Sequence, residues 1–309
     1  MNDEKRISLD FFKLEPVTKN EEEIPDLAQG IRKALTDIPD GFKFNSLKRT
    51  DDRIFMFGEL VTKRPYILGT LVRVQLQDLP PSFDEHTQNL EPLKLSMAQG
   101  LAYPTCFLYD PDVNVVMIEH PRGGVTIGTF CKFLMVNLDI PKLDASVVIN
   151  PVEMEKFLRM GVINRFHVRI AKVEDGDLLA GEGPKAVSQI IDSADQTNTD
   201  ILEYKLSVRS AKGKGNTLSL ARVRKWVNTF VKYKDTNEVQ VLKVTGKDEE
   251  NEQTSAIDLI KQRLREWISV EKQRLNGSFM INEKHEMMVE VYNKHRDGLL
   301  NMYKRKKIS

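Results

Sequence analysis

The sequence predicts an α+β protein made of two mixed α/β domains and ending in a C-terminal helix. Stretches with the two-residue period of strands and stretches with helical spacing both recur along the 309 residues, without a strict strand–helix–strand order. The segment "DIPKLDASVVINP" (139–151) separates two such series and resembles a domain joint. We therefore expect an N-terminal domain at residues 1–145 and a C-terminal domain at 146–309 that carries the final helix.

The first domain is expected to contain strands, a hairpin and two helices. Strands are predicted at residues 6–14, 53–61 and 67–81, and a hairpin at 103–120. The hairpin is predicted because two apolar runs flank the turn-forming residues Asp110 and Pro111. Helices are predicted at 24–35 and 126–138, where apolar residues recur at helical spacing. Residues 82–100 lack a clean period, which indicates a long loop.

Beyond the joint, the pattern of strands and helices starts again. Helices are expected at residues 152–161, 183–194, 219–233 and 283–307, and strands at 164–174, 201–210 and 238–247. Residues 256–274 fit either a continuous helix or a helical turn that leads into a strand from about Leu264.

Composition and charge limit the classes of partner. The chain has 46 basic and 45 acidic residues, so no overall charge steers it toward nucleic acid or membranes. The two cysteines, Cys106 and Cys131, lie in apolar segments and are expected to be buried thiols of a reducing compartment. The N-terminal segment has no apolar signal region, and no apolar run reaches the ~18 residues of a membrane-spanning helix. We expect a cytoplasmic protein that reaches a membrane, if at all, through a partner.

One segment departs from this balance of charges. Residues 205–234 contain nine Lys or Arg residues and no Asp or Glu. The segment covers the end of a predicted strand, a loop "SAKGKGN" and the predicted helix at 219–233. A surface of this kind attracts phosphate backbones by counterion release, without reading sequence. The expected DNA-binding residues are Lys205, Arg209, Lys212, Lys214, Arg222, Lys225 and Lys232. The alternative is an ordinary solvated face, because charge runs are usually exposed and unbound.

The helix at 219–233 is predicted to be amphipathic. Its apolar stripe consists of Leu220, Val223, Val227 and Phe230, and its opposite face of Arg222, Lys225, Thr229 and Lys232. Trp226 falls at the edge of the stripe, where we expect it to pack against the core.

No arrangement of residues typical of an enzyme stands out. We therefore expect no catalysis, no cofactor and no small-molecule substrate. The five histidines lack metal-ligand spacing, His167 in "RFHVRI" is expected to be structural, and His285 and His295 lie in a polar helix. The alternative is a metal-dependent nuclease. Glu203-x-Lys205, with Asp192, Asp195 or Asp200 upstream, resembles the E-x-K half of restriction-type sites that hold Mg²⁺.

Three stretches carry a resemblance to known proteins: "LGTLVRVQLQDLPP", "AYPTCFLYDPDVNVVMIEHPRGGVTIGTFCKFL" and "IDLIKQRLREWISVEKQRLNG". They resemble a family of bacterial and phage-borne proteins. More loosely, the layout resembles the RexA-like and KwaB-like proteins of phage exclusion and of the Kiwa anti-phage defence system. This resemblance implies DNA binding with little sequence preference, coupled to a small integral membrane protein in antiviral defence or abortive infection. A third alternative is a pure protein-binding subunit.

A homodimer is also expected, because two basic patches related by a two-fold axis match the spacing of a duplex better than one. The apolar residues of the final helix are candidate interface residues or, equally, core residues: Met287, Met288, Val291 and Leu299.

Overall fold

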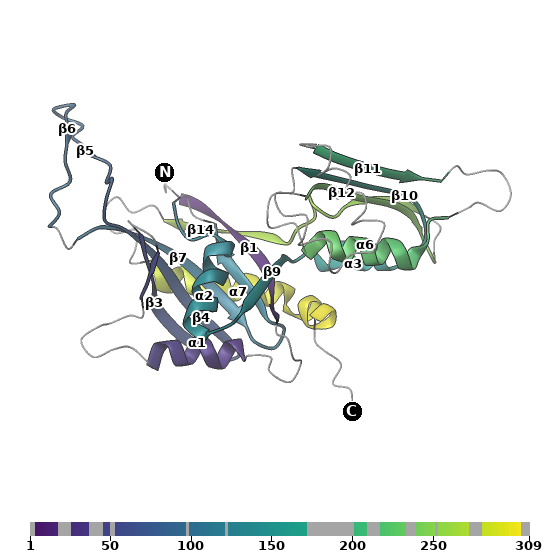
Figure 1. Cartoon of the computed structure of the whole chain (residues 1–309), viewed down its shortest axis with the longest axis horizontal. Helices are drawn as coiled ribbons and strands as arrows, with labels where there is room; N and C mark the ends of the chain where they lie inside the picture. The colour runs from purple at the N-terminus through teal and green to yellow at the C-terminus, as the bar shows by residue number, and fades with distance from the viewer. Residues whose placement is uncertain are drawn as a thin grey trace. The chain divides into compact units, whose positions relative to one another are not determined.

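The structure confirms the predicted α+β class (Figure 1). It is a computed structural model that describes residues 4–17, 26–36, 46–49, 53–96, 99–120, 123–171, 201–208, 217–232, 239–250, 253–271 and 280–303. The chain divides into two units. Unit 1 comprises residues 1–10, 14–144 and 266–296, and unit 2 comprises residues 11–13, 145–265 and 297–309.

Unit 1 is built on a large sheet with the strand order β14-β1-β8-β7-β4-β3-β2. These strands are β1 (Glu4–Val17), β2 (Ser46–Arg49), β3 (Arg53–Lys63), β4 (Tyr66–Gln75), β7 (Leu101–Asp110), β8 (Val115–Glu119) and β14 (Arg265–Glu271). The antiparallel pair β7–β8 is the predicted hairpin. Its apolar strands are buried, as continuous apolar runs indicate for strands covered on both faces.

Helices lie on both faces of this sheet. The first helices are α1 (Leu27–Thr36) and α2 (Ile127–Leu138), and the side chain of Thr126 caps the start of α2. Phe130 of α2 packs edge-on against Phe107 of β7, with ring centroids 5.0 Å apart. Helix α7 (Ile281–Tyr303) contacts the other face, where Arg296 pairs with Asp110 of β7. Phe107 and Asp110 are an odd number of positions apart along the strand, so their side chains point to opposite faces.

Unit 2 contains a four-stranded antiparallel sheet with the order β11-β10-β12-β13. The strands are β10 (Met160–Ala171), β11 (Ile201–Ser207), β12 (Val239–Asp248) and β13 (Thr254–Asp258). Two helices, α3 (Pro151–Leu158) and α6 (Leu220–Lys232), contribute to the same core. Trp226 of α6 packs against Phe166 of β10 and Tyr204 of β11, with ring centroids 5.4 and 6.1 Å away.

Two predictions need correction, and one choice that the sequence left open is decided. The expected joint contains a strand, β9 (Lys142–Val147), which pairs with β1, although the two units do divide between Asp144 and Ala145. Strand β14 and most of α7 belong to unit 1 rather than to the C-terminal domain. Residues 256–274 are not one helix: β13 is followed by a turn and by β14, so the strand expected from about Leu264 is present.

Other predictions about local structure are confirmed, modified or left untested by the structure. The segment predicted to be a loop carries one minimal strand pair, β5 (Ser82–Phe83) with β6 (Leu90–Glu91). Both cysteines are buried, as expected, and neither forms a disulfide. The helix expected at 183–194 lies outside the described residues. Within the described part of the chain, no helix is long and apolar enough to cross a membrane.

Candidate nucleic-acid interface

The seven cations predicted to bind DNA are only partly covered by the structure. Lys205 is exposed on β11, and Arg222 and Lys225 are exposed on α6. Lys232 ends α6, but its side chain is not among those described. Arg209, Lys212 and Lys214 lie outside the described residues.

The described members of this set lie on opposite sides of unit 2. Tyr204 and Leu206 of β11 pack against the core that α6 covers, so Lys205 between them points to the other face of the sheet. Arg222 and Lys225 are on the outer surface of α6, away from its buried residues Val223 and Val227. Lys205 and the two helix cations therefore do not form one flat surface.

Lys205 instead belongs to a set of cations on the sheet face opposite α6. On β10, Phe166, Val168 and Ile170 are buried in the core, so Arg165, His167 and Arg169 alternate with them and point outward. The register carries this pattern across the sheet, because His167 lies between Lys205 of β11 and Lys243 of β12.

The outward face extends along β12 to Lys247. Val244 is buried and Lys243 and Lys247 flank it on the outward side. The strand register shifts between Ile163 and Arg165, opposite Gly246 and Thr245. A Cβ on Gly246 would come within 2.4 Å of the Val162 carbonyl oxygen, so this close approach requires glycine.

We call the outward side of this sheet the cationic face. Its basic residues are Arg165, Arg169, Lys205, Lys243 and Lys247, and its acidic residues are Glu203 and Asp258. Cations therefore outnumber carboxylates by five to two, with His167 counted as neutral. This excess is the electrostatic feature that phosphate groups recognise.

Glu203 is held between two of the basic groups. The Nζ atom of Lys205 lies 2.9 Å from its carboxylate, and Nε2 of His167 lies 2.8 Å from it. The hydrogen bond from Lys205, followed by that from His167, lowers the pKa of Glu203 below its ordinary value. Glu203 is therefore ionised at neutral pH and offsets part of the positive charge around it.

The other cations of the face are less neutralised. Lys243 lies 3.7 Å from Asp258. Among the described residues, the carboxylates of this face form ion pairs with Lys205, His167 and Lys243. Within the same described part of the chain, Arg165, Arg169 and Lys247 form no such ion pair on this face, although Arg169 is directly opposite Glu203 in the strand register. These three groups are the best placed to contact an added phosphate.

The cationic face does not carry a stacking platform. The aromatic residues of its strands, Phe166 and Tyr204, point into the core. Proteins that bind single strands usually stack bases on exposed aromatic rings. The chemistry of this face therefore favours contacts to the phosphate backbone over contacts to unstacked bases.

Three side chains of α6 test or refine the prediction. Trp226 is buried, as expected. Thr229 was predicted to be on the exposed face but is buried, and its hydroxyl donates to the Lys225 carbonyl at 3.0 Å, which satisfies it inside the helix. Arg224 is held by the Leu158 carbonyl oxygen at 2.6 Å and so has a structural role.

The structure describes only part of the site expected for the nuclease alternative. Glu203 and Lys205 are adjacent, but the carboxylate is already bonded to Lys205 and His167. Asp192, Asp195 and Asp200 lie outside the described residues. Among the residues that the structure does describe, no group of three or more potential metal ligands occurs.

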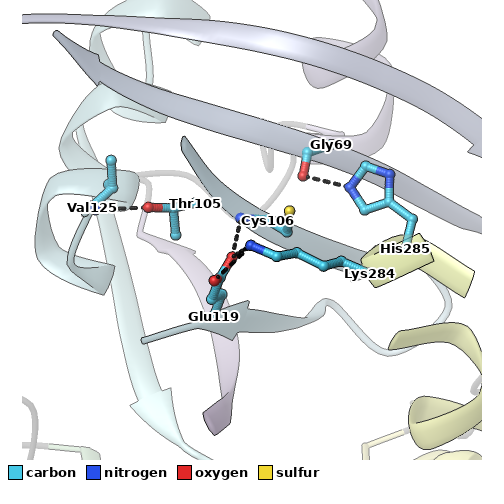
Figure 2. Close-up of polar contacts among 7 residues, drawn as sticks. All are labelled: Gly69, Thr105, Cys106, Glu119, Val125, Lys284 and His285. Carbon is cyan, nitrogen blue, oxygen red and sulfur yellow. Dashed lines mark hydrogen bonds and ion pairs between the residues drawn. The ribbon is translucent and has the colours of Figure 1, made fainter. Parts of the chain in front are cut away.

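A second polar cluster lies inside unit 1, where α7 meets the sheet (Figure 2). Lys284 donates to both carboxylate oxygens of Glu119, at 3.0 and 3.3 Å, and the Cys106 N–H donates to the same carboxylate at 3.1 Å. His285 donates to the Gly69 carbonyl at 3.1 Å. His285 was expected on a polar helix face, but it is buried.

The properties of this buried cluster suit a structural role. Burial, and then the charge of Glu119, raise the pKa of the Cys106 thiol to about 12. The thiol is therefore protonated and a poor nucleophile. Glu119 and Lys284 are almost completely buried and satisfy each other, so the cluster serves to fix α7 on the sheet.

A comparison with protein families matches residues 2–307 to a family of unknown function, DUF6731. The chain belongs to the DUF6731 family. No curated protein matches it. The site in this DUF6731 protein must therefore be argued from its own residues.

Sequence reasoning missed most of the cationic face of this DUF6731 chain. Arg165, Arg169, Lys243 and Lys247 lie outside the acid-free segment that drew attention to residues 205–234. The signal is an alternation of charge with apolar residues in "RFHVRI" and "KVTGK". Applying the two-residue strand period to the charges, as well as to the apolar residues, would have identified these residues.

Proposed function

We propose that this protein binds duplex DNA, with little sequence preference, through phosphate contacts on the cationic face of unit 2. The observation that carries the proposal is the placement of Arg165, Arg169, Lys205, Lys243 and Lys247 on one side of one sheet, against two carboxylates.

The dimensions of the face suit a nucleic-acid backbone. Residues two apart on a strand are separated by ~6.8 Å, so the groups of Arg165 and Arg169 start ~13 Å apart. Phosphates of one DNA strand advance ~3.4 Å along the helix axis per nucleotide. The two arginines therefore cover an axial length of about four nucleotides when the strand lies along the helix axis, and the neighbouring strands add a second row of cations ~4.8 Å away.

The biological setting is part of the same proposal. The resemblance to RexA-like and KwaB-like proteins supports a role as a DNA-binding sensor or effector in phage exclusion or anti-phage defence, acting with a small integral membrane protein. In this proposal the chain itself is not a catalyst.

The test is a titration of fluorescent duplexes of unrelated sequence, followed by anisotropy over a range of salt concentrations. We expect similar affinities for all the sequences and a steep fall of affinity with salt. Arg165→Ala combined with Arg169→Ala should reduce the slope of log K against log salt by about 1.8, since each lost phosphate contact removes about 0.9.

Arg222→Ala combined with Lys225→Ala is the matched control, because it removes the same charge from the same unit on the other side of the sheet. We expect it to bind like the wild type. If only this control variant loses affinity for DNA, the DNA binds at α6, as the acid-free segment at residues 205–234 predicted. Undetectable binding at low salt, or binding to one sequence only, would contradict the proposal.

A further inference from the structure

Residues 76–96 of unit 1 form a projecting arm between β4 and β7. Figure 1 shows the strand pair β5–β6 of this arm well apart from the large sheet. From Leu76 to Ser96, nearly every described residue is exposed. Its strand pair has only two residues in each strand, so the ladder alone is marginal in water and local hydrogen bonds must support it. The arm is therefore exposed along most of its length and open to contact with another surface.

Large apolar side chains occupy the end of the arm. Phe83 and Leu90 are direct partners across the strand pair, and they are 62% and 67% exposed. Single exposed apolar residues are ordinary, but a paired aromatic and aliphatic residue on a projection is typical of an interaction site.

The turn beyond this pair is already ordered by its own hydrogen bonds. The carboxylate of Asp84 accepts the N–H groups of His86 and Thr87 at 2.8 and 2.9 Å, and the Asp84 N–H donates to the Asn89 carbonyl at 3.0 Å. The Ser82 hydroxyl donates to the Glu91 carbonyl at 3.0 Å. Phe83 and Leu90 are thus presented in a fixed arrangement, which lowers the entropic cost of binding.

The charge of the arm restricts what it binds. Its charged residues are Asp78, Asp84, Glu85, Glu91 and Lys94. Four acids against one base repel phosphates and anionic lipid headgroups. The partner is therefore a protein surface that is basic and has apolar positions between its charges.

Every copy of this chain carries such a surface. The cationic face has its excess of basic residues, and the same side of the sheet displays the apolar residues Ile201, Val241 and Ala256. Ile201 is 47% exposed. We infer that the acidic arm of one copy docks on the cationic face of a second copy, with Phe83 and Leu90 as its apolar anchors. A reciprocal exchange of two arms closes a two-fold dimer.

The inference uses the surface of the proposed function but does not require DNA to bind there. If DNA does bind, the arm and the phosphate backbone compete for the same cations. Without DNA, the arm would then cover the cationic face. Only a DNA concentration high enough to displace the arm would expose this face.

The test is the molar mass of the full chain without DNA, measured by light scattering at micromolar concentration in low and high salt. We expect twice the monomer mass in low salt and a shift toward the monomer in high salt, because the contact is partly ionic. Phe83→Ser combined with Leu90→Ser should give a monomer in low salt. Val136→Ser combined with Val152→Ser is the matched control, since both valines are 58% exposed elsewhere, and it should remain dimeric.

The second half of the test locates the receiving surface. Arg165→Glu combined with Arg169→Glu should also give a monomer, and adding Asp78→Lys and Glu85→Lys to it should restore the dimer. A monomeric wild type, a dimer that survives the arm variant, or a dimer that survives the arginine reversal overturns the inference. Circular dichroism of each variant confirms folding. Because no DNA is present, this result is independent of whether the proposed function holds.

Discussion

Substitution of Glu203 should have opposite effects in a DNA-binding protein and in a nuclease. It is ionised within the cationic face and bonded to Lys205 and His167. Glu203→Gln removes a negative charge that repels phosphate, so we expect the affinity for duplex DNA to rise several-fold at low salt and the salt dependence to steepen. Plasmid incubated with Mg²⁺ or Mn²⁺ should stay intact with either protein. Metal-dependent cleavage that Glu203→Gln abolishes would instead establish the nuclease.

The same residue sets a pH dependence of stability. The folded-state pKa of Glu203 is lower than its unfolded value. Its contacts therefore stabilise the fold above the unfolded pKa, and this contribution is lost as the pH falls through the folded-state pKa. The difference in unfolding midpoint between wild type and Glu203→Gln should be present at neutral pH and shrink in acid. Because the side chain is exposed, the difference should be small.

Trp226 separates packing from binding. Its ring contacts Phe166 and Tyr204 in the core of unit 2. Trp226→Ala should lower the free energy of unfolding by about 3–5 kcal/mol, the usual cost of removing a buried large aromatic side chain. DNA affinity measured well below the melting temperature should be nearly unchanged. Its neighbour Lys225 is exposed, so Lys225→Ala should change stability by no more than about 0.5 kcal/mol.

At the scale of elements, the sequence predicted best what is determined locally. The hairpin β7–β8 has its turn residues between its strands, and α2 begins at a threonine cap. The apolar stripe of α6 was also predicted. Thr229 was wrongly placed on the exposed face, since a buried threonine can satisfy its hydroxyl within its own helix. For the apolar residues of α7, either an interface or the core was open, and the structure supports the core, since Met288, Val291 and Leu299 are buried within the chain.

Pairings between distant segments were not predictable in the same way. Strand β14 pairs with β1 although more than 240 residues separate them, and nothing in either segment specifies the partner. The cationic face has the same origin, because His167 meets Lys205 and Lys243 only through the register of three strands. A pattern in one strand shows which side chains share its face, but not which strands lie beside it.

The attachment of α7 gives a prediction at the element scale. Lys284 and Glu119 form a buried ion pair. Lys284→Met leaves the Glu119 carboxylate buried without its counter-charge, which should cost about 3–5 kcal/mol. Adding Glu119→Gln removes that charge and keeps an acceptor for the Cys106 N–H, so the double variant should recover part of the loss. The urea midpoint measures both.

An exposed pair provides the control for this measurement. Lys142 and Asp144 lie 3.4 Å apart, but both side chains are about half exposed. Lys142→Met should change stability by less than about 1 kcal/mol. A cost for Lys284→Met as small as this would show that the buried pair does not hold α7.

At the scale of the whole molecule, the order of segments along the chain differs from the order of units. Residues 266–296, which include most of α7, return to unit 1 after residues 145–265 of unit 2, and residues 297–309 belong to unit 2 again. Unit 1 is therefore incomplete without residues that follow most of unit 2 in the chain. A division of the sequence at one point, as the joint at 139–151 suggested, cannot separate the two units.

The two tryptophans allow each unit to be followed separately. Trp226 belongs to unit 2 and Trp267 to unit 1, where Arg6 lies 4.7 Å from the centre of its ring. Trp267→Phe leaves fluorescence that reports on unit 2, and Trp226→Phe leaves fluorescence that reports on unit 1. If the units unfold independently, Lys284→Met should move the urea transition seen by Trp267 to lower urea, because its buried pair lies in unit 1. The transition seen by Trp226 should keep its midpoint. Equal shifts of both transitions would mean that the two units unfold as one cooperative structure.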